Sequence, residues 1–248
     1  VIIVGGGHNG LVAATYLGRA GLRTIVLERR EFVGGACVTE ELFPGFRFSS
    51  CSYVCHMLQD KVIQDLELRK YGFEIFQNDP TLFNLFPDGH HLPSWRDEKK
   101  TIKEIQRFSE HDAEVYPKWI DFWKKAAEII HKYFLRAPPT LDDLTEDVRG
   151  TEKEEILNIM LTTDLRSFVE EYFESEQVRI SKIPFTQDIG PRIPGGVLCL
   201  AYFKIGMLGD QKNSGLVKGG MGTITQAMAR SAESKGVKIR TGVEVKKI

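Results

Sequence analysis

Three glycines near the start of the chain have the spacing of a phosphate-binding turn. They are Gly5, Gly7 and Gly10, and the apolar residues 1–4 come directly before them. A short β-branched run is typical of a strand that is buried in a parallel sheet, and glycines let the chain turn sharply into a helix. The N–H groups at the start of such a helix favour an anion without any basic side chain. The pattern predicts a site for the pyrophosphate of a dinucleotide.

The residues that follow predict the elements that would position this turn. Residues 11–17 are mostly apolar and predict a helix that Gly21 ends, and residues 22–27 predict a second strand. Glu28 lies 18 residues after Gly10, where a carboxylate accepts hydrogen bonds from ribose hydroxyls and repels a 2′-phosphate. The alternative is an α/β unit that merely contains three glycines. The order of strand, glycines, helix, strand and acid favours the dinucleotide site.

A second glycine pair helps to distinguish between dinucleotides. Gly34 and Gly35 follow Glu28 closely, and Arg30 lies between the acid and the pair. Two adjacent glycines let another backbone segment pass close to the pyrophosphate, and the arginine is placed to offset its charge. Simple NAD dehydrogenases need no such element. Residues 28–35 resemble the corresponding segment of two-dinucleotide-binding flavoproteins, so FAD is the expected cofactor and NAD the alternative.

Two further segments narrow this resemblance to one group of flavoproteins. Residues 38–49 read Val-Thr-Glu-Glu-Leu-Phe-Pro-Gly-Phe-Arg-Phe-Ser. Residues 218–222 read Lys-Gly-Gly-Met-Gly and come before a predicted helix and a strand that is expected over residues 237–245. Both segments resemble phytoene desaturase-related FAD-dependent oxidoreductases. Amine oxidases of the wider superfamily usually carry an arginine directly after the glycine pair, where this chain has Ala36. Ala36 therefore favours the desaturase-like branch.

The resemblance implies a set of cofactor-binding residues. The first glycine motif with Asn9 would contact the pyrophosphate, Glu28 the adenosine ribose, and the backbone of Val245 the adenine, while Arg30 and the glycine pair would flank the phosphates and the ribityl chain. The full set is Gly5, Gly7, His8, Asn9, Gly10, Glu28, Arg29, Arg30, Gly34, Gly35, Ala36 and Val245. No catalytic residue is assigned, because residues 201–204 read Ala-Tyr-Phe-Lys where the relatives carry a pair of histidines.

The predicted fold is α/β, a Rossmann-like FAD/NAD(P)-binding domain with an inserted α+β substrate or lid domain. We expect the FAD-binding domain in residues 1–70 and 213–248, because both parts show alternating strands and helices. Residues 71–212 form the inserted domain, in which short strands precede amphipathic helices. The chain starts inside the first strand and members of the family are longer, so we expect a truncated chain that lacks part of the FAD domain.

Two kinds of element are predicted at the start of the inserted domain. Strands are expected at residues 73–76, 82–86 and 90–92, with a hairpin turn between the last two. Ser109 is then expected to begin a long helix that is kinked at Pro117.

Further along, charge and apolar spacing predict a linker and another helix. Residues 142–155 are highly charged and predict a loop or a mobile link. Asp164 is expected to begin a helix with an aromatic face, which is either core or the lining of an apolar cavity, and core is favoured. Residues 190–196 predict a loop, and residues 197–208 an apolar segment that lines a tunnel.

Composition and the remaining reactive residues argue against several classes of function. The formal net charge of -1 gives no general attraction to nucleic acid, and the apolar stretch 195–208 is shorter than the ~20 residues that span a bilayer. The cysteines are Cys37, Cys51, Cys55 and Cys199, and their only close pair, Cys51 and Cys55, lacks the spacing of a redox pair, so small buried or half-buried thiols are expected. His90 and His91 are adjacent and lack partners at ligand spacing, so no metal site is predicted.

The resemblance implies an oxidoreductase that removes a hydride equivalent from a C–H bond of an apolar small molecule, with an external electron acceptor that reoxidises FAD. Alternatives are an amine oxidase-like flavoenzyme and a non-enzymatic flavin-binding regulatory protein that acts through protein partners or as a homo-oligomer. Peripheral contact with a membrane is a further hypothesis, based on the aromatic helix face and on the apolar substrates of the relatives. The implied compartment is the mitochondrial matrix in a eukaryote and the cytoplasm otherwise.

Overall fold

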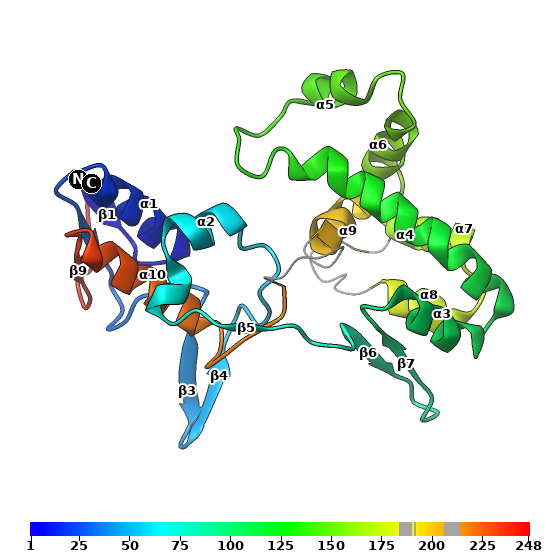
Figure 1. The fold of residues 1–248 in the computed structure, drawn as a ribbon, viewed down its shortest axis with the longest axis horizontal. Coiled ribbons are helices and arrows are strands. Elements are labelled where there is room, and N and C mark those ends of the chain that lie inside the picture. Colours follow the sequence, from blue (N-terminus) through cyan, green and yellow to red (C-terminus); the bar gives the residue numbers. More distant parts are fainter. Residues whose placement is uncertain (184–189, 191, 206–213) are drawn as a thin grey trace. The chain divides into compact units, whose positions relative to one another are not determined.

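The chain divides into two compact units. The computed structural model describes residues 1–183, 190, 192–205 and 214–248. One unit comprises Val1–Asn78 and Lys212–Ile248, and the other comprises Asp79–Gln211 (Figure 1). The first unit extends eight residues beyond the expected boundary at residue 70, because β5 (Ile75–Phe76) pairs with β8 (Leu216–Val217) in the same unit. The second junction lies within residues 206–213, outside the described part.

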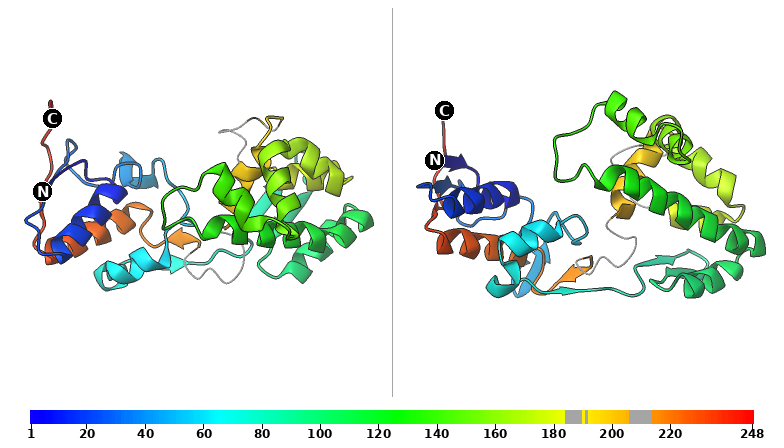
Figure 2. Two further views of the ribbon diagram at one scale, coloured as in Figure 1. Left: turned by 90° about the horizontal axis from the view of Figure 1, so that it is seen from above. Right: turned by 45° about the horizontal axis from the view of Figure 1, so that its top comes forward.

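The first unit is built on a parallel three-stranded sheet. Its strands are β1 (Ile2–Val4), β2 (Ile25–Leu27) and β9 (Lys238–Arg240), in the order β1-β2-β9. The helices α1 (His8–Arg19) and α10 (Gly222–Ser234) lie side by side in both views (Figures 1 and 2). Ala14 of α1, Val26 of β2 and Ala232 of α10 are fully buried together. This packing of helices on parallel strands confirms the strand–helix–strand order predicted for residues 1–27.

Strand β9 ends earlier than the sequence predicts. The expected strand continued to Val245, but regular pairing stops at Arg240 and Gly242 adopts a φ of +66°. The chain nevertheless stays beside the loop after β2, because the N–H groups of Gly242 and Val243 donate to the carbonyls of Arg30 and Glu28, both at 2.9 Å. Turn-like backbone therefore replaces the last part of the expected strand.

A hairpin and two short helices complete the first unit. The hairpin strands β3 (Thr39–Phe43) and β4 (Phe46–Ser49) are antiparallel, and α2 (Asp60–Asp65) and the 3-10 helix η1 (Leu68–Tyr71) follow. Phe43 and Phe46 flank the turn, and each is 65% exposed. This hairpin is not among the elements predicted from the sequence.

The second unit begins with a predicted hairpin and a predicted long helix. Strands β6 (Leu82–Leu85) and β7 (His91–Ser94) pair antiparallel, as expected, and α3 (Glu98–Gln106) follows. The side chain of Ser109 accepts a hydrogen bond from the N–H of Asp112 and begins α4 (Glu110–His131). Helix α4 continues as one helix through Pro117.

The prediction of a loop for residues 142–155 is wrong. This segment forms most of α5 (Leu141–Val148) and the start of α6 (Lys153–Thr162). A capping box begins α5, since the Thr140 hydroxyl accepts from the N–H of Asp143, and the Asp143 carboxylate accepts from the N–H of Thr140. Two backbone donors at the helix start are thereby satisfied, which stabilises a helix despite the high charge.

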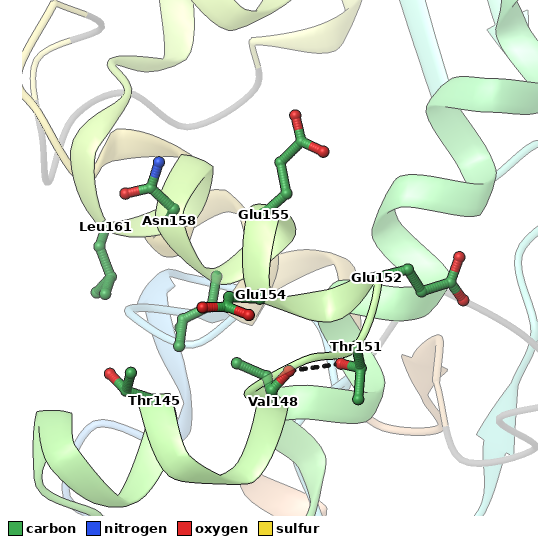
Figure 3. Close-up of a pocket in the computed structure, with 9 residues that line it drawn as sticks. Thr145, Val148, Thr151, Glu152, Glu154, Glu155, Asn158 and Leu161 are labelled. Atoms are coloured by element: carbon green, nitrogen blue, oxygen red, sulfur yellow. Dashed lines mark hydrogen bonds between the residues drawn. The ribbon is translucent and has the colours of Figure 1, made fainter.

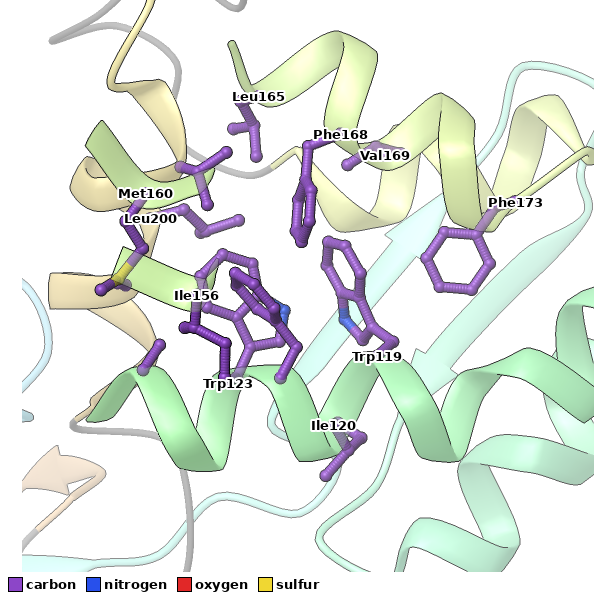
Figure 4. Close-up of a cluster of buried hydrophobic side chains, with 14 of the residues drawn as sticks. Trp119, Ile120, Trp123, Ile156, Met160, Leu165, Phe168, Val169, Phe173 and Leu200 are labelled. Carbon is purple, nitrogen blue, oxygen red and sulfur yellow. The ribbon is translucent and has the colours of Figure 1, made fainter. Parts of the chain in front are cut away.

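The aromatic face after Asp164 is part of a hydrophobic core, as favoured from the sequence. Asp164 caps α7 (Leu165–Tyr172), and α8 (Glu176–Lys182) and α9 (Gly196–Ile205) follow. Trp119 and Trp123 project from α4 toward Phe168 of α7 (Figure 4), and all three are at most 1% exposed. Buried side chains of α9 join the same core, so this part of the predicted tunnel lining is core instead. Residues 206–208 of that segment lie outside the described residues.

In the described residues, no helix combines the length and apolar character needed to cross a bilayer.

Candidate functional site

The first glycine motif forms a tight turn from β1 into α1. Gly5 has a φ of +98°, which favours glycine, and its N–H donates to the carbonyl of Leu27 at 2.8 Å. A Cβ on Gly10 would lie 2.3 Å from the carbonyl oxygen of Gly5, so α1 packs too closely on the turn for any larger residue. Helix α1 has no side-chain cap and no acid in its first turn. Its first N–H groups are therefore suited to bind an anion.

The second glycine pair lies directly against this turn. The N–H of Gly34 donates to the carbonyl of Gly6 at 2.8 Å, and Gly34 forms a parallel bridge with Gly7. A Cβ on Gly35 would lie 3.2 Å from the Cα of Gly7. Two backbone segments without side chains thus run side by side at the start of α1. This arrangement fits a pyrophosphate, which needs close approach of backbone N–H groups.

The Glu28 carboxylate connects the first glycine turn to the backbone that follows β2. The residue is only 7% exposed, and its two oxygens accept from the N–H groups of Gly6 at 2.7 Å and Arg30 at 2.9 Å. Each carboxylate oxygen retains a lone pair for a further donor. The position therefore suits the hydroxyls of a ribose, and the negative charge disfavours a 2′-phosphate.

Arg30 is held by partners that the sequence analysis did not identify. Its guanidinium forms an ion pair with Glu40 and lies 4.2 Å from the centre of the Phe32 ring. Ser50 donates to the other oxygen of Glu40 at 2.6 Å, and this bond, with the charge of Arg30, lowers the pKa of the Glu40 carboxyl. The acid comes from β3, and only the pairing of β3 with β4 brings it beside Ser50. No local spacing rule in the sequence signals this contact.

The other residues in the expected set differ in their surroundings. His8 and Asn9 are exposed in the first turn of α1, and Arg29 and Ala36 are exposed after β2 and the glycine pair, respectively. Val245 lies in the irregular segment after β9 and is half-buried. The N–H of Val243, which is not in the expected set, donates instead to the backbone carbonyl of Glu28 at 2.9 Å.

Residues 218–222 are tied to the hairpin beside the glycine pair. The N–H of Gly222 donates to the Thr39 hydroxyl at 2.9 Å, and the N–H of Met221 donates to the Ser49 hydroxyl at 3.0 Å. A Cβ on Gly222 would lie 2.5 Å from the backbone nitrogen of Thr39. Hydroxyls from β3 and β4 therefore accept hydrogen bonds from backbone N–H groups at the start of α10. These bonds hold residues 218–222 against the segment that follows the glycine pair.

A hollow of about 740 Å³ opens beside these segments. Backbone and side chains from both parts of the first unit form its wall: Phe32, Val33, Val38, Thr39, Glu40, Glu41, Arg47, Gly219, Gly222, Thr223, Gln226 and Arg230. It gives the region next to the glycine pair a concave surface with both charged and apolar groups.

The two buried cysteines of the first unit are free thiols whose surroundings disfavour reactivity. Cys37 and Cys55 are buried, as expected, whereas Cys51 is exposed, so the expectation is wrong for that residue. Burial raises the pKa of the Cys37 and Cys55 thiols to about 11. The thiolate, which is the nucleophile in redox exchange, is therefore disfavoured. Cys37 donates through Sγ to the carbonyl of Met221 at 3.2 Å, which assigns it a structural role.

Two other polar clusters lie in the second unit. A groove between α5 and α6 is lined by three glutamates (Figure 3), of which Glu152 pairs with Lys125 and Glu154 accepts from the N–H of Gly150. The side chains of His111, Asp112 and Glu174 lie within 4.8 Å of one another. The Asp112 oxygens, however, already accept backbone N–H bonds.

Two relatives match this chain along its whole length. Pyridine nucleotide-disulfide oxidoreductase domain-containing protein 2 of Mus musculus is 35% identical over 100% of this chain and 48% of that protein. Carotenoid 3,4-desaturase of Haloarcula japonica is 24% identical over 100% of this chain and 50% of that protein. The chain therefore spans about half the length of these relatives. The resemblance to desaturase-related flavoproteins is confirmed.

The fold also matches solved flavoenzymes. Wild-type putrescine oxidase bound to putrescine superimposes with a TM-score of 0.58 at 20% identity, over 96% of this chain and 50% of that one. The family model for flavin containing amine oxidoreductases matches residues 10–248. The chain thus belongs to the flavin-containing amine oxidoreductase family, and its cofactor is FAD.

Proposed function

We propose that the first unit holds the adenosine and pyrophosphate of FAD. The observation that carries this proposal is the contact between the two glycine segments, Gly6–Gly7 and Gly34–Gly35, with the Glu28 carboxylate bonded to the N–H groups of Gly6 and Arg30 beside it. The pyrophosphate would lie at the start of α1, and the ribose hydroxyls would donate to Glu28. Arg30, fixed by Glu40, would offset the phosphate charge, and the irregular segment 241–245 would contact the adenine.

We further propose that the complete protein dehydrogenates or desaturates an apolar small molecule. FAD supplies the capacity to accept a hydride equivalent, and an external acceptor then reoxidises it. The proposal is supported by similarity to a carotenoid desaturase along the whole chain and by Ala36, which stands where amine oxidases usually carry arginine. The chain's own residues bind and orient the cofactor, and we assign none of them a proton-transfer role.

An amine oxidase-like reaction is the second candidate. It is supported by the description of the matching family and by the similarity in fold to putrescine oxidase. The two candidates differ in the polarity of their substrates, because an amine is a hydrogen-bonding and usually charged molecule whereas a carotenoid is a hydrocarbon.

Anaerobic reduction of the full-length holo-protein distinguishes the candidates. Phytoene in detergent micelles and putrescine in buffer are each added, and the absorbance of oxidised flavin is followed. Loss of the flavin band with phytoene alone supports desaturation, and loss with putrescine alone supports amine oxidation. Stable FAD that neither compound reduces would instead favour a non-enzymatic flavin-binding protein that acts through protein partners.

Peripheral membrane contact is now best supported by the β3–β4 turn, because the aromatic face of α7 is buried in the core. Phe43 and Phe46 present exposed rings at this turn, and aromatic side chains suit a membrane interface. Liposome flotation of the full-length protein and of a Phe43→Ser, Phe46→Ser variant tests the contact, and equal flotation of the two would refute it.

For a eukaryotic host we propose that the protein lies in the mitochondrial matrix, which fractionation of cells would test.

A further inference from the structure

One imidazole and two carboxylates of the second unit lie close together. His111 and Asp112 belong to the first turn of α4, and Glu174 lies in the link between α7 and α8. One nitrogen or oxygen atom from each of the three side chains lies within 4.8 Å of the other two. Imidazole nitrogen and carboxylate oxygen are ligands of a divalent ion such as Zn²⁺. The three side chains therefore have the chemistry of a metal site.

The spacing of His111 and Asp112 matches that of two ligands on one ion. Nδ1 of His111 lies 3.4 Å from Oδ1 of Asp112. Two ligands of a tetrahedral zinc ion, each about 2.1 Å from the metal, are about 3.4 Å apart. Glu174 is exposed, so its side chain has the freedom to close the longer distances in the set. Three protein ligands leave the fourth position of a tetrahedral ion to water.

Hydrogen bonds orient both carboxylates. The Asp112 oxygens accept from the backbone N–H groups of Glu174 at 2.8 Å and Ser175 at 3.0 Å. The Glu174 carboxylate accepts from the hydroxyl of Ser109 at 2.7 Å. Each carboxylate oxygen has two lone pairs, so these bonds leave capacity for an ion. Carboxylates that bind metals are themselves held by such outer hydrogen bonds, and the set is therefore already arranged for an ion.

The burial of Asp112 favours a cation at this point. Its side chain is 0% exposed, whereas that of His111 is 53% exposed. Among the described residues, His111 is the single ion-pair partner of Asp112, and it is charged only when protonated. Asp112 also attracts the charge of Lys182, a 3% exposed residue at the end of α8. A divalent ion would interact more strongly with Asp112, because opposite charges attract strongly where water is scarce.

We propose that His111, Asp112 and Glu174 bind a zinc ion that links the start of α4 to the segment between α7 and α8. The two carboxylates match the charge of a divalent cation. Zn²⁺ is favoured over Ca²⁺ and Mg²⁺, because those ions prefer six or more oxygen ligands whereas this set includes an imidazole nitrogen. The site uses no residue of the proposed FAD site and does not depend on the flavin reaction.

Calorimetric titration of the full-length holo-protein with zinc chloride tests the site. We expect saturable binding of Zn²⁺, and binding of Mg²⁺ and Ca²⁺ that is at least about tenfold weaker. Zn²⁺ should also raise the melting temperature, because an ion that binds only the folded protein stabilises it. Absence of saturable Zn²⁺ binding, or binding of Mg²⁺ as tight as that of Zn²⁺, would overturn the proposal.

Substitutions assign the ion to these side chains. His111→Ala and Glu174→Gln should each weaken Zn²⁺ binding at least about tenfold and reduce the rise in melting temperature. Both residues are exposed, so the variants should remain folded. His131→Ala and Glu114→Gln are matched controls, because they remove an exposed imidazole and an exposed carboxylate from the same helix, and they should leave the affinity unchanged. Unchanged affinity in His111→Ala, or an equal loss in the controls, would overturn the assignment.

Discussion

Replacement of Glu28 by glutamine should weaken both the first unit and its hold on FAD. The Glu28 carboxylate is buried and accepts two backbone N–H bonds, from Gly6 and Arg30. Glutamine keeps one acceptor oxygen and places an NH₂ group against the other N–H. Because a hydrogen bond to a charged acceptor contributes about 1.5–3 kcal/mol and an unsatisfied buried donor costs a similar amount, we expect the apo-protein to lose about 2–3 kcal/mol of stability.

The same change should reduce FAD affinity. In the proposed site the ribose hydroxyls donate to Glu28, and loss of one charged acceptor corresponds to about a tenfold to hundredfold weaker Kd. Urea unfolding of the apo-protein gives the stability change, and titration of flavin fluorescence gives the Kd. Glu31→Gln is the matched control, because Glu31 is an exposed acid in the same segment, and it should change neither value substantially.

The reasoning is refuted if Glu28→Gln binds FAD as tightly as the unmodified protein. A loss of stability with unchanged affinity would mean that Glu28 only connects the glycine turn at Gly6 to the backbone of Arg30 and does not contact the ribose. A loss in both measurements by Glu31→Gln would indicate a general effect of charge.

Three further predictions follow from single contacts. Gly10→Ala places a Cβ within 2.3 Å of the Gly5 carbonyl oxygen, so gel filtration should show FAD lost from a folded protein; retention of FAD would contradict the turn geometry. Lys182→Met should raise the melting temperature. Because burial lowers the pKa of Lys182 to about 7, the unfolded chain binds more protons than the folded protein between about pH 7 and about pH 10, and the unfolding free energy of the unmodified protein should rise there by up to roughly 4 kcal/mol more than that of the variant. Parallel curves of unfolding free energy against pH would refute this. Asp143→Ala removes half of the α5 capping box and should cost about 1 kcal/mol, seen as faster amide exchange in α5 and unchanged exchange in α7.

The sequence was sufficient for features that depend on local chemistry. The turn at Gly5, the close packing at Gly10 and the caps at Ser109 and Asp164 each follow from a short pattern in which the side chain acts on its own neighbourhood. Glu28 was also located correctly at the end of β2, because the length of a strand–helix–strand unit varies little.

Features that depend on distant pairing were missed. Arg30 is held by Glu40 only because β3 and β4 form a hairpin, and the start of α10 is capped by Thr39 and Ser49, which lie about 180 residues away in sequence. The high charge of residues 142–155 predicts a loop, whereas the capping box of Thr140 and Asp143 begins α5 in the structure. Net charge predicts exposure, whereas caps decide whether an exposed segment is helical.

We propose that the two glycine segments together hold the pyrophosphate of FAD, with the ribose on Glu28. A crystal structure of the full-length holo-protein would show the cofactor in place. We expect the pyrophosphate at the start of α1 beside Gly7 and Gly35, and ribose hydroxyls within hydrogen-bond distance of the Glu28 carboxylate. A dinucleotide other than FAD, or FAD with its pyrophosphate away from both glycine segments, would overturn this proposal.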